Sequence, residues 1–180
     1  MKTILVTGGA GFIGSNYLNL VVPQNPSITY INFDCLTYAG NLENLTSIEN
    51  APNYKFVKGN ICSVDEIKSV FSTYQITDVV HFAAESHVDR SILGPRAFIE
   101  TNINGTFNLL QTAYKLWMHE PFSIKEEFKR DRFLHVSTDE VYGTLGDEGL
   151  FTEETPYAPN SPYSASKASS DLLVRSYFHT

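Results

Sequence analysis

Several features that identify whole classes of protein are scarce or missing in this sequence. Only two of the 180 residues are cysteines, Cys35 and Cys62, which excludes a disulfide framework and a zinc site built from cysteines. His81 and His87 have no further histidine or cysteine at a matching spacing, so no metal site is expected. No apolar run is long enough to cross a bilayer, and residues 1–3 lead into a strand pattern, not a signal peptide. The sequence therefore predicts a cytoplasmic protein without a membrane partner.

Positive charge is also in short supply. Lysine and arginine number 13 against 20 aspartates and glutamates, so the formal net charge is −7. The most basic segment, residues 125–132, also contains Glu126, Glu127 and Asp131, and we expect it to be a solvated surface insertion. This balance argues against a nucleic-acid partner.

What is present fits one globular core. The composition is 42% hydrophobic and 18% charged, and 180 residues are too few for two full domains. Helical patterns alternate with short apolar runs, which we interpret as strands, at residues 2–7, 28–33, 54–58, 77–82 and 132–137. This alternation predicts an α/β fold, a doubly wound (Rossmann-type) parallel sheet of order 3-2-1-4-5 with helices on both faces.

A glycine-rich loop follows the first strand and leads into a helical pattern that continues to Pro23. The order of strand, glycine loop and helix is the context in which a dinucleotide is bound, with its pyrophosphate at the helix N-terminus. The residues that we expect to contact a cofactor in this loop are Gly8, Gly11, Phe12, Ile13 and Gly14.

An acidic residue stands where the second strand ends. Asp34 lies 20 residues after Gly14, where a carboxylate binds the adenosine ribose hydroxyls. No arginine follows in residues 35–37 to balance a 2′-phosphate, so NAD is favoured over NADP. A turn or helix cap is the alternative role for Asp34.

Hydroxyl, carboxylate, phenol and amine groups gather near the carboxyl end. The fifth strand runs into Thr138, Asp139 and Glu140, and Tyr163 and Lys167 lie four residues apart in a helix. They therefore share one helix face, and the ammonium group stabilises a phenolate. Lowering a tyrosine pKa from about 10 toward neutrality requires about 4 kcal/mol, which Lys167 and a second positive charge could supply. The pair is interpreted as an activated general base.

These motifs carry a family resemblance. The Tyr163-x-x-x-Lys167 pair with an upstream hydroxyl resembles the extended, nucleotide-sugar-modifying branch of the short-chain dehydrogenase/reductase superfamily. The segment 137–143, STDEVYG, is similar within that branch to the dTDP-glucose 4,6-dehydratases. The resemblance implies an NAD-dependent lyase that converts dTDP-glucose to dTDP-4-keto-6-deoxyglucose, with NAD recycled in the active site.

The same resemblance implies roles for the catalytic residues. Tyr163 takes the proton from the sugar 4-hydroxyl, Thr138 binds the 4-oxygen, and Lys167 supports Tyr163 and the nicotinamide ribose. Glu140 takes the C5 proton, and Asp139 protonates the departing 6-hydroxyl. Two neighbouring carboxyl groups in different surroundings suit paired acid and base roles.

Further contacts are implied by position in the family. Ser86 faces the sugar nucleotide, and Asn60 stands where the family usually has an aspartate that contacts the adenine amino group. Because asparagine keeps an acceptor oxygen, we expect an altered adenine contact and not its loss. The remaining cofactor residues that the resemblance implies are Leu36, Thr37, Ile61, Phe82, Ala83, Ala84, Thr101, Tyr163 and Lys167.

The resemblance covers only the cofactor half of the family's architecture. Residues 1–180 are expected to form an incomplete NAD-binding domain without the family's smaller substrate domain, and alone to be inactive. The helices beginning at Pro95 and Pro162 carry more apolar surface than one sheet face needs, so we expect a homodimer.

Two alternatives stay open. A nucleotide-sugar 4-epimerase needs Thr138 and Tyr163 but not the Asp139–Glu140 pair. A non-enzymatic NAD-binding module needs neither Tyr163 nor Lys167.

Overall fold

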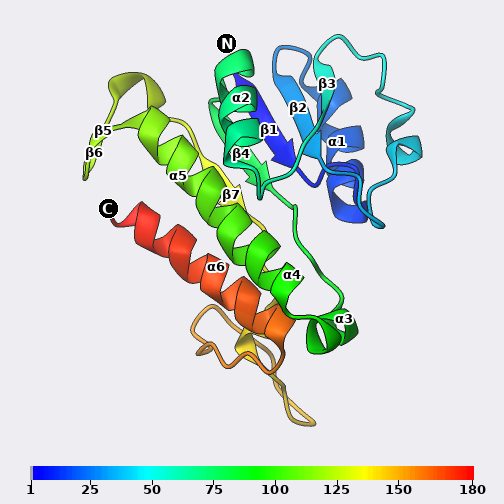
Figure 1. Cartoon of the computed structure of the whole chain (residues 1–180), viewed down its shortest axis with the longest axis vertical. Coiled ribbons are helices and arrows are strands. Elements are labelled where there is room, and N and C mark those ends of the chain that lie inside the picture. Colours follow the sequence, from blue (N-terminus) through cyan, green and yellow to red (C-terminus); the bar gives the residue numbers. More distant parts are fainter. Residues whose placement is uncertain (1) are drawn as a thin grey trace.

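A parallel five-stranded sheet organises the molecule. The computed structural model describes residues 2–180, and its main sheet has the order β3-β2-β1-β4-β7. Because β7 is the fifth strand of this sheet in chain order, the predicted order 3-2-1-4-5 is confirmed. The strands are β1 (Thr3–Thr7), β2 (Thr29–Asp34), β3 (Tyr54–Lys58), β4 (Asp78–His81) and β7 (Phe133–His135). Figure 1 shows the helices packed around this sheet.

Each strand contributes side chains to both faces of the sheet, which is why the apolar runs are continuous. Leu5, Ile31 and Val79 point to one face, where they pack with side chains of α2 and α5. Ile4, Val6 and their neighbours point to the other face, which α1 covers. Two separate cores therefore hold the sheet between helical layers. The three helices are α1 (Phe12–Gln24), α2 (Val64–Tyr74) and α5 (Thr106–Trp117).

The helix expected to begin at Pro95 is not uniform. It consists of α4 (Arg96–Phe98), a π-helical segment η2 (Ile99–Gly105) and α5. The wider π turn changes which side chains face the sheet edge, and such turns are frequent at functional sites. Next to it lies α6 (Pro162–Phe178), which in Figure 1 runs beside α5 and α4.

Shorter elements complete the fold. The sequence did not predict α3 (Val88–Leu93) or the small antiparallel pair β5 (Met118–Glu120) and β6 (Ser123–Ile124). Both are too short for a periodic pattern to reveal. The remaining single-turn helices are η1 (Leu42–Leu45), η3 (Glu126–Phe128) and η4 (Asp139–Tyr142). Among the described residues, no helix has both the length and the apolar character needed to cross a membrane.

Candidate active site

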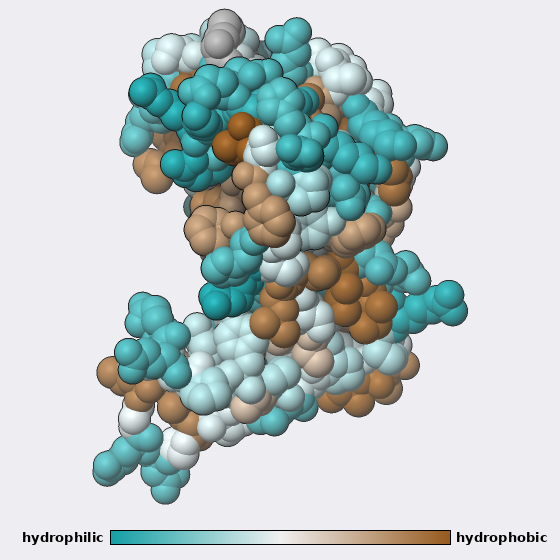
Figure 2. Space-filling model, turned by 90° about the vertical axis from the view of Figure 1, so that its left-hand side faces the viewer, coloured by the Kyte–Doolittle hydropathy of each residue, from teal (hydrophilic) through white to brown (hydrophobic). Residues whose placement is uncertain are grey.

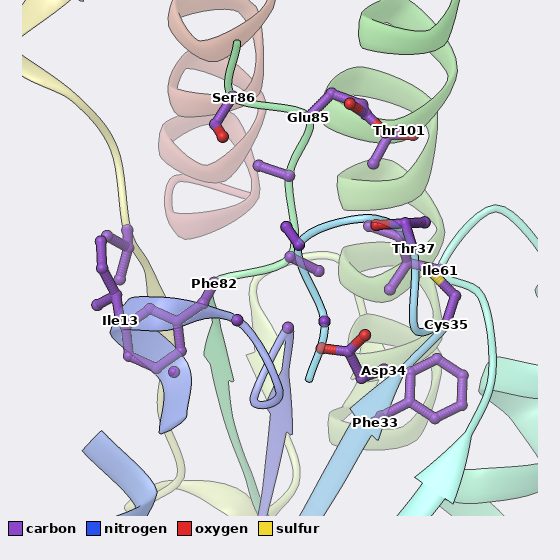
Figure 3. A pocket seen from close by; sticks show the side chains of 18 of the residues that line it. Ile13, Phe33, Asp34, Cys35, Thr37, Ile61, Phe82, Glu85, Ser86 and Thr101 are labelled. Atoms are coloured by element: carbon purple, nitrogen blue, oxygen red, sulfur yellow. The ribbon is translucent and has the colours of Figure 1, made fainter. Parts of the chain in front are cut away.

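The carboxyl ends of the parallel strands meet along one edge of the sheet, and a cavity of about 550 Å³ opens there. The loops after β1, β2, β3, β4 and β7 line it, together with residues from η2 and α6. Figure 3 shows side chains from these loops converging on it, with Asp34 at the end of one strand and Ser86 and Thr101 on the opposite side. This is the crevice in which doubly wound sheets bind their ligands.

Close backbone contacts shape the glycine loop. Gly8 has φ of +71°, and a Cβ there would lie 2.6 Å from the backbone nitrogen of Ala83. A Cβ on Gly14 would lie 2.3 Å from the carbonyl oxygen of Gly8. Only glycine therefore allows α1 to begin so near the end of β1.

The N-terminus of α1 is open to an anion. Gly11 occupies the N-cap position, no side chain caps the helix there, and its first turn contains no acidic residue. The first N–H groups of a helix have no partner within the helix, and the helix dipole favours negative charge at this end. The loop and helix thus fit a pyrophosphate.

Asp34 has the turn-capping role that the sequence offered as an alternative, and its position also leaves it open to a ligand. Its carboxylate accepts hydrogen bonds from the backbone N–H groups of Ala10 (3.0 Å) and Leu36 (2.8 Å), so it fixes the turn after β2 and joins it to the glycine loop. Each carboxylate oxygen accepts more than one hydrogen bond, so acceptor capacity remains for a ribose. Asp34 also lines the cavity.

The sequence of the helix after β3, with Ser63 three residues before Glu66, has the spacing of a capping box, but only half of that motif forms. Ser63 does cap α2 by accepting from the N–H of Glu66. Glu66, however, does not return to Ser63: its carboxylate accepts from the N–H of Asn60 at 2.8 Å. The reason is that the N–H of Ser63 already donates to the carbonyl of Asn60 at 2.9 Å. Glu66 therefore stabilises the turn at the cavity and not only the helix.

One buried amide connects three segments of the site. Asn102, in the π-helical segment, accepts from the N–H of Glu85 (2.8 Å) and donates to the carbonyl of Glu85 (2.9 Å). Its Nδ2 also donates to Ser166 (2.9 Å), whose hydroxyl donates to the carbonyl of Tyr163 (2.6 Å). Asn102 thus holds the loop after β4 and the start of α6 at a fixed separation.

Tyr163 and Lys167 are held on α6 by a well-formed helix start. Ser161 caps the helix by accepting from the N–H of Ser164 (3.0 Å), and Pro162 occupies the first turn, as the sequence predicted. Both side chains line the cavity and are buried. Tyr163 and Lys167 therefore lie at the same end of the site.

The surroundings of Tyr163 do not lower its pKa as the sequence argument expected. Burial raises the pKa of Tyr163, a hydrogen bond from Thr138 lowers it, and the charges of Glu140, Asp139 and Asp171 raise it again. The net direction is upward. The ammonium of Lys167 donates instead to the carbonyl of Val136 at 2.7 Å. Lowering the pKa of Tyr163 toward neutrality would therefore still require a second positive charge near its hydroxyl.

A buried polar cluster that the sequence did not reveal surrounds Lys167. Asp171, one turn further along α6, lies 3.1 Å from His135 Nε2 and accepts hydrogen bonds from Ser137 and from Tyr157 (3.1 Å). Burial raises the pKa of Asp171, but these hydrogen bonds outweigh it and the net shift is downward. Burial lowers the pKa of His135, and burial lowers the pKa of Lys167 to about 8.

The carboxylate pair lies in the short helix η4, which begins at the end of the loop after β7. Thr138 caps this helix by accepting from the N–H of Glu140 (3.3 Å). Asp139 is exposed and Glu140 is half-buried, so their surroundings differ. Neither they nor Thr138 line the cavity, but Thr138 is within hydrogen-bonding reach of Tyr163, which does.

Every residue that the sequence assigned to the cofactor lines the cavity except Leu36. Leu36 adopts φ of +54° and packs its side chain against the core under α1. Sequence reasoning missed several lining residues that are chain neighbours of the predicted ones and could have been found from their place at strand ends: Phe33, Cys35, Gly59, Glu85, Val136 and Ser137.

The two histidines considered for a metal have other surroundings. His81 is fully buried between the hydroxyls of Thr7 (2.6 Å) and Thr106 (2.9 Å), and burial holds its pKa well below the usual range. His87 stacks near Tyr38, with ring centroids 5.4 Å apart. Within residues 2–180, no cluster of three or more histidine, cysteine or acidic side chains is arranged to hold a metal ion.

The lowered pKa of Lys167 predicts a pH-dependent stability. Between about pH 8 and the ordinary lysine pKa of 10.5, the Lys167 amine is protonated in the unfolded chain but not in the folded chain. The free energy of unfolding therefore rises with pH over this range, because the folded chain no longer buries a charge. We compare urea unfolding of the wild type with Lys167→Met, which keeps the aliphatic stem. The difference in unfolding free energy should shift by about 2 kcal/mol in favour of the wild type between pH 8 and pH 10. A difference that stays constant over this range would refute the lowered pKa.

Comparison with known proteins agrees with this geometry. The chain is 55% identical over 180 residues to a dTDP-glucose 4,6-dehydratase of Xanthomonas campestris, covering 100% of this chain and 50% of that protein. It superposes with a TM-score of 0.83 and 45% identity on the crystal structure of dTDP-glucose 4,6-dehydratase from Bacillus anthracis in complex with NAD, covering 99% of this chain and 51% of the other. The crystal structure of a UDP-glucose 4-epimerase of Thermus thermophilus in complex with NAD is more distant, at 26% identity and a TM-score of 0.80. The match covers 97% of this chain and 50% of the other.

The chain spans about half the length of the relatives it matches. A family model described as GDP-mannose 4,6 dehydratase matches residues 5–180, nearly the whole chain. The chain therefore belongs to the GDP-mannose 4,6 dehydratase family.

Proposed function

We propose that the cavity binds NAD. The uncapped N-terminus of α1 takes the pyrophosphate, Asp34 takes the adenosine ribose, and Tyr163 and Lys167 lie at the nicotinamide end. The carboxylate of Asp34 disfavours a 2′-phosphate, so we propose NAD and not NADP. The crystal structure of the Bacillus anthracis relative, which contains NAD, supports this assignment.

We further propose that the protein acts on a nucleotide sugar as a 4,6-dehydratase, with dTDP-glucose as the substrate. The observation that carries this proposal is the position of η4, whose carboxylates Asp139 and Glu140 follow directly after Thr138, beside Tyr163. Bound NAD supplies the hydride acceptor and donor and a positive charge beside Tyr163.

The chain's own residues move the protons. Tyr163 takes the proton of the sugar 4-hydroxyl, and Thr138 donates a hydrogen bond to the 4-oxygen and polarises the ketone. The ketone acidifies C5, where Glu140 takes the proton, while Asp139 gives one to the departing 6-hydroxyl. Lys167 holds the nicotinamide ribose, and Ser86 at the cavity wall contacts the sugar nucleotide.

The alternatives lack a feature that this chain has. A 4-epimerase reaction uses Thr138 and Tyr163 but gives no role to Asp139 and Glu140. A pure binding module gives no role to a phenol at Tyr163 beside Thr138. We therefore favour the dehydratase.

Residues 1–180 serve in this proposal as the NAD-binding domain, and the contacts to the substrate's nucleotide come from outside them. The free thiols of Cys35 and Cys62 suit the reducing cytoplasm, where we place the protein.

A homodimer completes the proposal. The large hydrophobic side chains of Phe107 on α5 and of Leu172 and Phe178 on α6 are 41%, 58% and 84% exposed. Figure 2 views the side on which β5, β6 and the end of α6 lie in Figure 1, and it shows hydrophobic patches at mid-height. Patches of this kind on neighbouring helices suit contact with a second copy.

The carboxylate pair gives a prediction about activity. A chimera of residues 1–180 with the second half of the Xanthomonas campestris relative should form the 4-keto-6-deoxy product from dTDP-glucose. The double change Asp139→Asn and Glu140→Gln should abolish that product but leave NADH formation detectable, because C4 oxidation does not need these groups. Continued dehydration by the double variant would refute the acid and base roles.

The 180 residues alone should form no product from dTDP-glucose. Without the contacts to its nucleotide the sugar is not held in a reactive orientation, and this loss forfeits roughly 7–11 kcal/mol of barrier lowering.

Cofactor choice can be measured on the chain itself. Calorimetric titration should show tighter binding of NAD than of NADP, because Asp34 repels a 2′-phosphate. Asp34→Ala should reduce this preference, whereas Asp65→Ala, which removes an exposed carboxylate on α2, should leave it unchanged. Equal or tighter binding of NADP by the wild type would contradict the assignment.

Association can be tested by sedimentation. At a protein concentration of roughly tens of micromolar, the wild type should sediment as a dimer. Leu172→Glu should sediment as a monomer, because it places a charge in the contact. A wild type that stays monomeric at that concentration would rule out the proposed contact.

A further inference from the structure

The turn after β3 holds Asn60 in a single conformation. Its backbone N–H donates to Glu66 (2.8 Å), and its carbonyl accepts from the N–H of Ser63 (2.9 Å). Its side-chain oxygen Oδ1 accepts from the N–H of Cys62 at 2.9 Å. Both the backbone and the side chain of Asn60 are therefore fixed before any ligand binds.

These contacts also fix which way the amide of Asn60 points. A backbone N–H can only donate, so the atom facing Cys62 must be the side-chain oxygen and not the nitrogen. The Nδ2 group has no hydrogen-bond partner within residues 2–180, and Asn60 is exposed in the wall of the cavity. The side chain thus offers two N–H donors to a ligand.

Asn60 lies where the purine of a dinucleotide must lie. With the pyrophosphate at the start of α1 and the ribose at Asp34, the base extends beyond Asp34, away from the glycine loop. Figure 3 shows Cys35, Thr37 and Ile61 on that side of Asp34, opposite Ile13. Asn60 immediately precedes Ile61 and lines the same part of the cavity wall.

The donor on Asn60 matches one kind of purine better than another. Adenine carries at position 6 an amino group, which is itself a donor. A 6-oxo purine, such as hypoxanthine, carries an acceptor oxygen at that position. Two donors facing each other leave both without a partner, whereas an N–H facing a carbonyl forms a hydrogen bond.

We infer that Asn60 determines purine specificity, and that its Nδ2 group lets this site accept dinucleotides with a 6-oxo purine as well as NAD. The inference rests on the proposed NAD site and adds a class of cofactor to it. An aspartate at position 60 would keep the turn, because its carboxylate also accepts from the N–H of Cys62, but it would offer only acceptors. It would therefore favour the amino group of adenine and repel a 6-oxo oxygen.

The test is calorimetric titration with NAD and with nicotinamide hypoxanthine dinucleotide. The wild type should bind both within about threefold of each other, and Asn60→Asp should weaken the hypoxanthine form relative to NAD by at least about tenfold. Asn50→Asp is the matched control, because it adds the same charge at an exposed residue outside the cavity wall and should leave the ratio unchanged. Circular dichroism of the two variants checks that the fold is kept.

Three results would overturn the inference. In the first, the wild type binds NAD but prefers it over the hypoxanthine form by more than about tenfold. In the second, Asn60→Asp leaves the ratio of the two affinities where it was. In the third, neither dinucleotide binds the folded wild type, which refutes the proposed cofactor site itself and this inference with it.

Discussion

The central position of β1, paired in parallel with β2 on one side and β4 on the other, is the constraint on which the site depends. The chain leaves β1 for one half of the sheet and crosses back to build the other half, so the loops after β1 and β4 diverge at one edge. A crevice must open where they part. The glycine loop lies at this point, where Gly8 approaches the backbone of Ala83 closely and so leaves the crevice open at the start of α1. An anion can then reach the N–H groups of α1.

A second constraint attaches α6 to that crevice. The sheet alone would leave α6 free to shift along α5, because apolar packing is not directional. Hydrogen bonds from the buried amide of Asn102 remove this freedom by joining Glu85, after β4, to Ser166 on α6. Asn102 lies in the π-helical segment η2, and its side chain is buried. Tyr163 and Lys167 are therefore placed relative to the sheet by polar contacts as well as by packing.

Burial gives the site its electrostatic character. Lys167, His135 and Asp171 lie together at the end of β7, with the amine bonded to a backbone carbonyl and the carboxylate bonded to hydroxyls and an imidazole. Buried charged groups need such partners, because burial removes the water that hydrates them and only hydrogen bonds or ion pairs can replace it. Lys167 lines the cavity beside this cluster. Burial, in contrast, raises the pKa of Tyr163, and the nearby carboxylates add to this shift.

The family resemblance implied most of the cavity wall. The sequence by itself determined the fold class, the strand order and the glycine loop. Those follow from local rules: apolar runs form buried strands, glycines permit a tight turn, and strand ends of a parallel sheet gather at one edge. Gly14, Asp34 and Tyr163 were therefore identified from spacing. Only the tertiary structure decided which partner each polar group found: Glu66 bonds Asn60 instead of Ser63, Leu36 turns into the core, and Asp171 reaches His135 across 36 residues of chain. Hydrogen bonds form between groups that folding brings within about 3 Å, and a linear sequence does not contain that distance.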